Sequence, residues 1–278
     1  MLIDNDNSPC VQLFIFVALA CEAKPLVQFF DLKKDLAIRP FSIYKRGSIV
    51  LTVAGVGKVA MGGAVAYSLA RFNHASNPAL LNVGIAGHKT ESVGALFRVM
   101  KIIDRDTANV YFPPIIAKNA PPTCVLTTVS KPAKQYQADM LYDMEAAAFY
   151  EMAVRFSSSE WVQCIKIVSD NEQSPVENIN AKQVQQWITQ QMRGIECVVK
   201  DLLSLSTVAM PIEPEGYQQM LEQWHFTVSQ QIRLRALLLR RGVLTQGARF
   251  TFDPDELKNA KQLLKKLETE LDQLVFFL

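Results

Sequence analysis

Short apolar runs and longer helical patterns alternate along the first 205 residues. A short apolar run bounded by turn residues is typical of a buried strand, whereas apolar residues spaced three and four apart predict a helix. The expected strands lie at residues 11–20, 42–44, 48–53, 79–83, 96–103, 124–128, directly after Met140, and at 161–168. The expected helices lie at residues 25–30, 58–72, 145–156 and 181–205. This alternation predicts an α/β domain whose sheet is mostly parallel and carries helices on both faces.

Strand patterns vanish after Met210-Pro211, where the character of the chain changes. One helix is expected at residues 214–241, ended by Gly242, and another at 254–274. The second has the signals of a helix start, with Asp253 as N-cap and Pro254 at the first position. We therefore expect an α/β domain over residues 1–205 and a C-terminal helical hairpin over residues 206–278, packed on the first domain or on a partner subunit.

Composition and charge narrow the class of protein. Hydrophobic residues make up 49% of the chain, enough for a large core, and the net charge of +2 does not indicate nucleic acid or an anionic membrane as a partner. The apolar run at residues 11–21 is too short to span a membrane, and Asp4 and Asp6 precede it where a signal peptide needs positive charge. We expect a cytoplasmic protein.

The chain offers no pattern of metal ligands. The three histidines are scattered, and the cysteines are widely spaced, odd in number and without a CxxC pair. The residues concerned are His74, His88, His225, Cys10, Cys21, Cys124, Cys164 and Cys197. The sequence therefore predicts no zinc site and no bound cofactor.

Carboxylates stand where chemistry is expected in such a sheet. Asp143 and Glu145 lie between apolar residues, and Ser169-Asp170 ends the strand expected at residues 161–168. Sites in α/β sheets lie at the carboxyl ends of the strands. Taken singly, Glu145 is also explained as a carboxylate at a helix start, and Asp170 as the cap of a following helix. A buried carboxylate without a partner is costly, so each of these groups needs one.

Two glycine segments follow expected strands. Gly55-Val-Gly57-Lys-Val-Ala60 matches a dinucleotide-binding fingerprint, yet the next strand ends without the acidic residue that would hold a ribose. Backbone amides near Gly55 and Gly57 favour a polar or anionic ligand group, and a plain tight turn explains the segment equally well. Gly84-Ile-Ala-Gly87 permits either a turn or the close approach of a flat ligand.

In their order, these segments resemble the nucleoside phosphorylase superfamily, and in particular its branch that cleaves methylthioadenosine and S-adenosylhomocysteine. The resemblance covers residues 11–205 and is most specific in its last two segments. The segments are Val17-Ala-Leu-Ala-Cys-Glu-Ala23, Ala54-Gly-Val-Gly-Lys58, Asn82-Val-Gly-Ile-Ala-Gly87, Asp143-Met-Glu-Ala-Ala-Ala148 and Ile167-Val-Ser-Asp170. The resemblance implies a twisted, mixed central sheet and the cleavage of an N-glycosidic bond.

The resemblance also implies roles for individual residues. Glu145 would accept hydrogen bonds from the ribose hydroxyls, Met144 would pack on the sugar, and Asp170 would protonate the departing base. Glu22 would activate water. These roles suit a bond that breaks through an oxocarbenium-like sugar, because a carboxylate stabilises the developing positive charge and an acid neutralises the base. The other expected substrate contacts are Gly55, Gly57, Ala86, Gly87 and Ser169.

The chain departs from the family pattern in four respects. The first-strand segment offers one carboxylate, Glu22, and no arginine stands where phosphorylases hold phosphate. Ala54 replaces the serine or threonine before the first glycine segment, and residues 99–140 offer no clear base-stacking segment beyond Tyr111-Phe112. The missing arginines favour hydrolysis of a purine nucleoside or related nucleoside over phosphorolysis.

Four functional hypotheses follow. The leading one is a nucleosidase that assembles as a homodimer or higher homo-oligomer, as members of this superfamily do. A phosphate-dependent phosphorylase and a nucleoside-binding protein with weakened catalysis remain alternatives within the same fold. A dinucleotide-dependent oxidoreductase is disfavoured by the missing ribose-binding acid.

Overall fold

In the computed structural model, the first strand, β1 (Val11–Val17), is buried on both faces. Its even-numbered residues Phe14 and Phe16 enter one apolar cluster, whereas its odd-numbered residues from Leu13 to Val17 enter a second. Side chains alternate across a strand, so a strand that is buried on both sides must be apolar throughout. The continuous apolar run in the sequence therefore marks the centre of the sheet.

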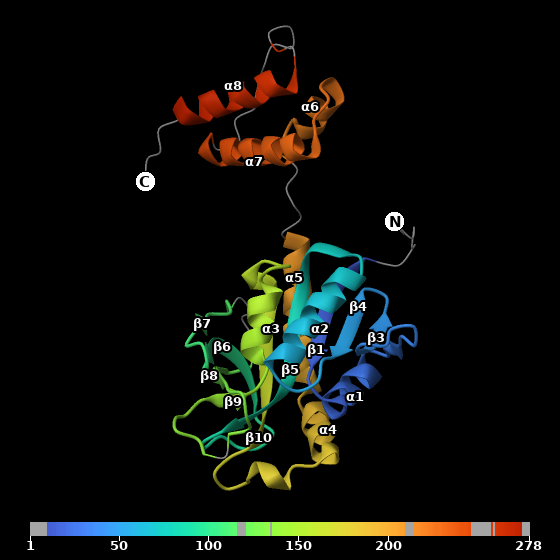
Figure 1. Cartoon of the computed structure of the whole chain (residues 1–278), viewed down its shortest axis with the longest axis vertical. Helices are drawn as coiled ribbons and strands as arrows, with labels where there is room; N and C mark the ends of the chain where they lie inside the picture. Colours follow the sequence, from blue (N-terminus) through green and yellow to red (C-terminus); the bar gives the residue numbers. More distant parts are fainter. Residues whose placement is uncertain are drawn as a thin grey trace. The chain divides into compact units, whose positions relative to one another are not determined.

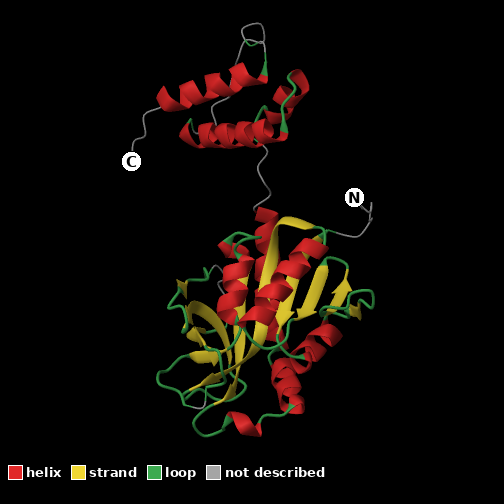
Figure 2. Cartoon of the chain, in the orientation of Figure 1, coloured by secondary structure: helices red, strands yellow, loops and turns green. Residues whose placement is uncertain are grey.

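The structure describes residues 10–115, 121–133, 135–208, 214–245, 257 and 259–273. Contacts between residues divide the chain into two units, Met1–Val208 and Ala209–Leu278. The first unit carries the sheet, and the second consists of helices in the part that is described (Figure 2). Within the described residues, no helix is both long enough and apolar enough to cross a membrane.

The sheet of the first unit is mixed, as predicted. Its path runs β10-β6-β8-β9-β5-β1-β4-β3-β2, with β7 paired to β6. β5 also pairs with β10, so β5, β10, β6, β8 and β9 close into a ring, while β1 to β4 extend from it as an open sheet (Figure 1). The remaining strands are β2 (Lys33–Lys34), β3 (Ser42–Arg46), β4 (Ile49–Val53), β5 (His74–His88), β6 (Leu96–Asp104), β7 (Val110–Tyr111), β8 (Thr123–Thr128), β9 (Leu141–Asp143) and β10 (Val162–Asp170).

Helices cover both faces of this sheet. α2 (Lys58–Arg71) and α3 (Ala146–Ala153) pack together over one face, in the cluster that contains Phe14. α1 (Ala20–Phe29), α4 (Ala181–Gln190) and α5 (Met192–Val208) pack over the other face, in the cluster that contains Leu13. The α/β architecture expected from the sequence is confirmed.

Three element boundaries differ from the expectation. α1 begins at Ala20 rather than at residue 25, because the Glu22 carboxylate accepts the backbone N–H groups of Ala18 and Leu19 and so stabilises an earlier helix start. α3 ends at Ala153, short of residue 156. The single helix expected at residues 181–205 is two helices, α4 and α5, which meet at Gln191.

The largest correction concerns Gly84-Ile-Ala-Gly87. The strand that was expected to end at residue 83 continues through this segment as β5, runs on to His88 and pairs with β10 and β9. Glycine is retained in a strand interior where another group approaches the backbone closely. A methyl group at Gly84 would lie 3.2 Å from both Glu22 Oε1 and Lys166 Nζ, and one at Gly87 would overlap the Tyr136 hydroxyl.

The second unit contains α6 (Tyr217–Gln223), α7 (Val228–Leu244) and α8 (Ala260–Gln273). The helix expected at residues 214–241 is interrupted, because Thr227 and Gln230 form a capping box that starts α7 anew. α7 also continues past Gly242. The expected helix start at Asp253-Pro254 and the apolar end at residues 274–278 lie outside the described residues.

Two arginines of α7 link this helix to α8, and one of them, Arg241, is largely buried. Arg233 and Arg241 form ion pairs with Glu268 and Glu270 of α8. Between the helices, Leu234 and its apolar neighbours form a core of their own. Ion pairs and apolar packing together therefore hold α7 against α8.

Candidate active site

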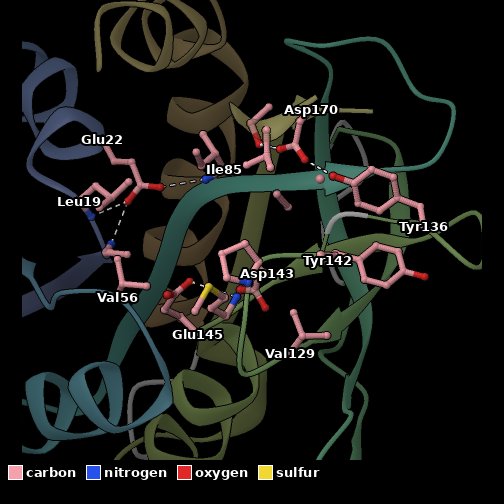
Figure 3. A pocket seen from close by; sticks show the side chains of 18 residues that line it. Leu19, Glu22, Val56, Ile85, Val129, Tyr136, Tyr142, Asp143, Glu145 and Asp170 are labelled. Carbon is pink, nitrogen blue, oxygen red and sulfur yellow. Dashed lines mark hydrogen bonds between the residues drawn. The ribbon is translucent and has the colours of Figure 1, made fainter. Parts of the chain in front are cut away.

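A cavity of about 220 Å³ lies where β1, β5, β9 and β10 end or bend. The three carboxylates expected at the site, Glu22, Glu145 and Asp170, line it together with Asp143 (Figure 3). Met144, Ala86, Gly87 and Ser169 line it too. Seven of the nine expected site residues are thus brought together from four separate segments. The side chains of all three carboxylates are largely buried, at 2%, 7% and 4% exposure.

Gly55 and Gly57 do not line the cavity, although Val56 between them does. Both adopt positive φ angles, 91° and 99°, which only glycine tolerates easily. The Gly57 N–H donates to Glu145 Oε1 at 2.7 Å. This segment therefore orients a carboxylate of the site through its backbone, and the expected anionic group at these amides is Glu145 itself.

Glu22 is fixed at the start of α1. Its Oε2 accepts the N–H groups of Ala18 and Leu19 at 2.9 and 2.8 Å, and its Oε1 accepts that of Ile85 in β5 at 3.0 Å. Burial raises the pKa of Glu22, an effect that the backbone hydrogen bonds partly offset. A rigid carboxylate whose pKa is raised is a stronger base than an exposed glutamate, which suits an acceptor for a proton from water.

Glu145 is the last residue before α3 and faces the cavity. Burial raises its pKa to about 7, and the neighbouring Asp143 adds to the rise while Lys166 opposes it. At neutral pH the carboxylate is therefore divided between its charged and its protonated form. A ligand that donates hydrogen bonds or carries positive charge would draw it to the charged form.

Replacing Glu145 with glutamine is expected to stabilise the protein at pH 8. The pKa of Glu145 is about 7 in the folded protein and 4.5 in an ordinary glutamate. The fold is therefore most stable with respect to this group below pH 4.5, where Glu145 is protonated in both states, and it loses stability as pH rises through 7. Glutamine stays neutral, so at 1.36 kcal/mol per pKa unit its free energy of unfolding at pH 8 should exceed that of the parent by about 3 kcal/mol. Urea unfolding should show this gain at pH 8 and little gain at pH 5, with the exposed Glu172→Gln as control. A loss of stability at pH 8 would show that the charged form is satisfied in the fold.

Asp143, whose partner the sequence did not reveal, is the centre of a buried ion pair. Lys166 Nζ lies 2.9 Å from Asp143 Oδ2, and the two side chains are 2% and 0% exposed. Thr128 Oγ1 donates to Asp143 Oδ1 at 2.7 Å, and the Ala146 N–H donates to Oδ2 at 2.8 Å. Every oxygen of this carboxylate is occupied, so Asp143 is a structural group although it borders the cavity.

Lys166 supplies the positive charge behind the site. Burial alone would lower its pKa, but Asp143 and Glu145 outweigh burial and raise it, so the ammonium group stays charged. Lys166 pairs in register with Gly84 of β5, and the missing side chain of Gly84 leaves room for both Lys166 and Glu22. Sequence reasoning missed this residue, although a lysine inside the apolar strand Val162–Asp170 was a signal for it.

Each carboxylate oxygen of Asp170 accepts a hydrogen bond from a hydroxyl group. Ser169 Oγ donates to Oδ1, and Tyr136 Oη donates to Oδ2 (Figure 3). Tyr136 belongs to the segment between β8 and β9, which the sequence analysis did not connect with the site. Its phenol packs on Tyr142, with ring centroids 5.2 Å apart.

The aromatic part of the cavity therefore comes from Tyr136 and Tyr142 and not from Tyr111-Phe112. Tyr111 lies on β7, packs on Tyr150 and donates to Glu151, and Phe112 is 65% exposed. This pair therefore does not line the described cavity. Neither tyrosine of the cavity belongs to a repeated pattern that sequence reasoning could have used.

Solved structures with this arrangement of strands were found by comparison, whereas no family model and no curated protein matches. The 5′-methylthioadenosine nucleosidase of Arabidopsis thaliana superposes with a TM-score of 0.54 over 71% of this chain and 96% of its own, at 19% identity. The methylthioadenosine/S-adenosylhomocysteine nucleosidase of Colwellia psychrerythraea, solved with adenine, superposes with a TM-score of 0.54 over 71% of this chain and 96% of its own, at 16% identity. Futalosine hydrolase of Helicobacter pylori superposes with a TM-score of 0.54 over 69% of this chain and 98% of its own, at 11% identity.

The chain has the nucleoside phosphorylase-like fold. The similarity covers nearly the whole length of each of these proteins, so the part of this chain that lies outside the match is additional to the fold they share. The nucleoside phosphorylase-like fold confirms the fold class predicted from the sequence. Among the described residues, no group of three or more histidine, cysteine or acidic side chains is placed to hold a metal ion.

Proposed function

We propose that the cavity cleaves the N-glycosidic bond of a purine nucleoside by hydrolysis. The observation that carries the proposal is the meeting of Glu22, Glu145 and Asp170 in one cavity at the strand ends of a nucleoside phosphorylase-like fold. The structures of that fold found by comparison are nucleosidases and a futalosine hydrolase, some of them with methylthioadenosine or adenine bound.

The three carboxylates divide the work by their surroundings. Asp170, held by Ser169, gives a proton or a hydrogen bond to the departing base. Glu145 accepts the ribose hydroxyls and stabilises positive charge on the sugar, with Met144 against the ribose. Glu22, fixed by three backbone N–H groups, takes a proton from the attacking water. The bond from C1′ to the base nitrogen breaks, and the water oxygen bonds to C1′.

Hydrolysis is favoured over phosphorolysis by the charges around the cavity. Its described lining contains four acidic residues, Glu22, Asp143, Glu145 and Asp170, and no arginine or lysine. Lys166 lies behind the lining and is engaged with Asp143. A phosphate dianion would meet carboxylates without a cation directed at it, which is unfavourable.

The test of the proposal is base release from a panel of purine nucleosides, including methylthioadenosine, by the purified full chain with and without phosphate. We expect free base and the free sugar in phosphate-free buffer, at a rate that phosphate does not raise. A requirement for phosphate, with a sugar 1-phosphate as product, would contradict hydrolysis. Ligand binding without base release would support the alternative of a nucleoside-binding protein.

Two further proposals follow from the same likeness. We expect a homodimer or a higher homo-oligomer, and residence in the cytoplasm. Sedimentation at the mass of a single chain would contradict the first, and fractionation with secreted or membrane material would contradict the second.

A further inference from the structure

We propose that Tyr136 is a gate that occupies the base side of the cavity and must withdraw before a nucleobase can reach Asp170. The inference rests on the proposed function and adds to it a residue that determines which bases gain access. Its basis is the set of contacts that Tyr136 makes with Asp170, Gly87 and two adjoining cavities.

Tyr136 lies in the segment of residues 130–140, most of which is exposed or partly exposed where it is described. Among the described residues from 130 to 140, it is the only buried side chain, at 9% exposure. The side-chain hydrogen bonds of Gln137 with Arg105 and of Asp139 with Thr90 lie at the surface. Ala133 and Met140 pack, partly buried, on the cluster that contains Tyr136. Outward movement of the segment therefore has to release one buried side chain and these two partly buried contacts.

Of the two hydrogen bonds that Asp170 accepts from hydroxyl groups, the one from Tyr136 can be replaced by a ligand. Asp170 has two hydroxyl donors, and Ser169 is its neighbour in the chain, so that donor moves with it. Tyr136 comes from a separate segment and holds the second oxygen. A base that approaches Oδ2 along the backbone of Gly87 must take the place of the Tyr136 hydroxyl, because the hydroxyl fills the space between that oxygen and the strand.

The phenol also occupies the space that a flat base needs. It lies so close to the backbone of β5 that a methyl group at Gly87 would overlap its hydroxyl and approach Asp170 Oδ2 to 2.8 Å. A glycine at this position admits a planar group against the strand. In the structure, that planar group is the ring of Tyr136 (Figure 3).

Tyr136 separates two cavities. The inner one, with the three carboxylates, has a volume of about 220 Å³, and an outer one of about 390 Å³ lies next to it. Ala133, Tyr136 and Val176 line both. Sites for small molecules commonly measure about 300–1,000 Å³. The inner cavity alone is below that range, and withdrawal of the phenol joins it to the outer one.

The lining of the outer cavity indicates the kind of base that fits. Apart from the shared residues, it consists mainly of amide and carboxylate side chains: Gln135, Gln137, Asn171, Glu172 and Glu177. The amides donate and accept hydrogen bonds, whereas the carboxylates of Glu172 and Glu177 only accept them. The two carboxylates therefore favour bases with exocyclic amino groups over bases with an apolar edge.

The test is the binding of adenine, measured by calorimetry, to the full chain and to Tyr136→Phe and Tyr136→Ala. The phenylalanine variant keeps the ring and loses only the bond that holds the gate shut, so we expect its dissociation constant to fall about tenfold or more. The alanine variant should bind at least as tightly as the phenylalanine variant. Tyr111→Phe removes the same kind of tyrosine–carboxylate bond outside the cavity and should change affinity less than twofold.

Equal or weaker binding by Tyr136→Phe would overturn the gate and make Tyr136 a fixed wall of the site. Absence of adenine binding by every variant would overturn it as well. Failure of the proposed function would be seen differently. If adenine binds with the expected order of affinities but no nucleoside releases its base, the proposed function is contradicted and the gate is not. Melting curves of each variant establish that it is folded.

Discussion

Replacement of Asp170 with asparagine is expected to lower kcat for base release by about 10²- to 10⁴-fold, the usual contribution of a positioned general acid. Asparagine keeps the shape of the side chain and one oxygen that accepts the Ser169 hydroxyl. It has no carboxylic proton to give to the departing base. Because the ground-state contacts are largely kept, KM should change much less than kcat. Steady-state kinetics with the best substrate of the nucleoside panel measure both constants.

The matched control is Asp31→Asn, which changes a 54% exposed aspartate in surface ion pairs with Lys33 and Arg46. Its kcat should stay within twofold of the parent value. An Asp170→Asn variant with full activity would remove Asp170 from the role of proton donor. An equal loss in both variants would point to a general effect on the protein and not to the site.

Replacement of Lys166 with methionine is expected to destabilise the fold by about 3–5 kcal/mol at pH 8. Removal of one partner of a buried ion pair leaves the other charge without compensation, which costs about this much. Here the loss also affects Glu145 and Glu22, whose pKa values Lys166 holds down. Protonation can neutralise these carboxylates instead, so the destabilisation should shrink as pH falls toward 5. Urea unfolding at both pH values measures it.

Two further variants separate the buried charge from a general effect of losing a lysine. Lys200→Met removes a 71% exposed lysine from an ion pair with Glu196 and should cost less than about 1 kcal/mol. Adding Asp143→Asn to Lys166→Met should restore part of the stability, because the amide still accepts the Thr128 hydroxyl without a charge. A double variant that is no more stable than Lys166→Met would contradict the electrostatic explanation.

The meeting of the carboxylates was predictable from the sequence because strand ends can be located from apolar runs. Asp170 follows such a run directly, and Glu145 follows a short one, and the carboxyl ends of neighbouring strands share one edge of a sheet. What could not be predicted was which carboxylate has a partner. Asp143 and Glu145 are two residues apart, yet only Asp143 faces Lys166 within hydrogen-bond distance, and that pairing depends on the register between strands.

Two errors in the fold have physical causes that a local pattern does not contain. Gly84-Ile-Ala-Gly87 has the composition of a turn, but pairing with β10 and β9 on either side holds it extended. The break between α4 and α5 is hidden, because buried residues at Val184, Ile188, Met192 and Ile195 keep helical spacing across it. In both places tertiary contacts decide the outcome.

Tyr136 shows the limit of pattern reasoning at the site itself. It stands between exposed polar residues, where a single tyrosine carries no periodic signal. Its contact with Asp170 joins residues 34 positions apart and depends on the path of an irregular segment. Residues contributed by such segments are found from the structure, whereas residues at strand ends are found from the sequence.

The most direct measurement is a crystal structure of the Asp170→Asn variant, in which turnover is slowed, with an intact purine nucleoside bound. We predict that the nucleoside lies in the cavity with its base edge at position 170, its ribose hydroxyls on Glu145 and a water molecule on Glu22, and that Tyr136 has left its place against Gly87. A nucleoside bound elsewhere, or one whose ribose faces position 170 while its base faces Glu145, would contradict the assignment of the site.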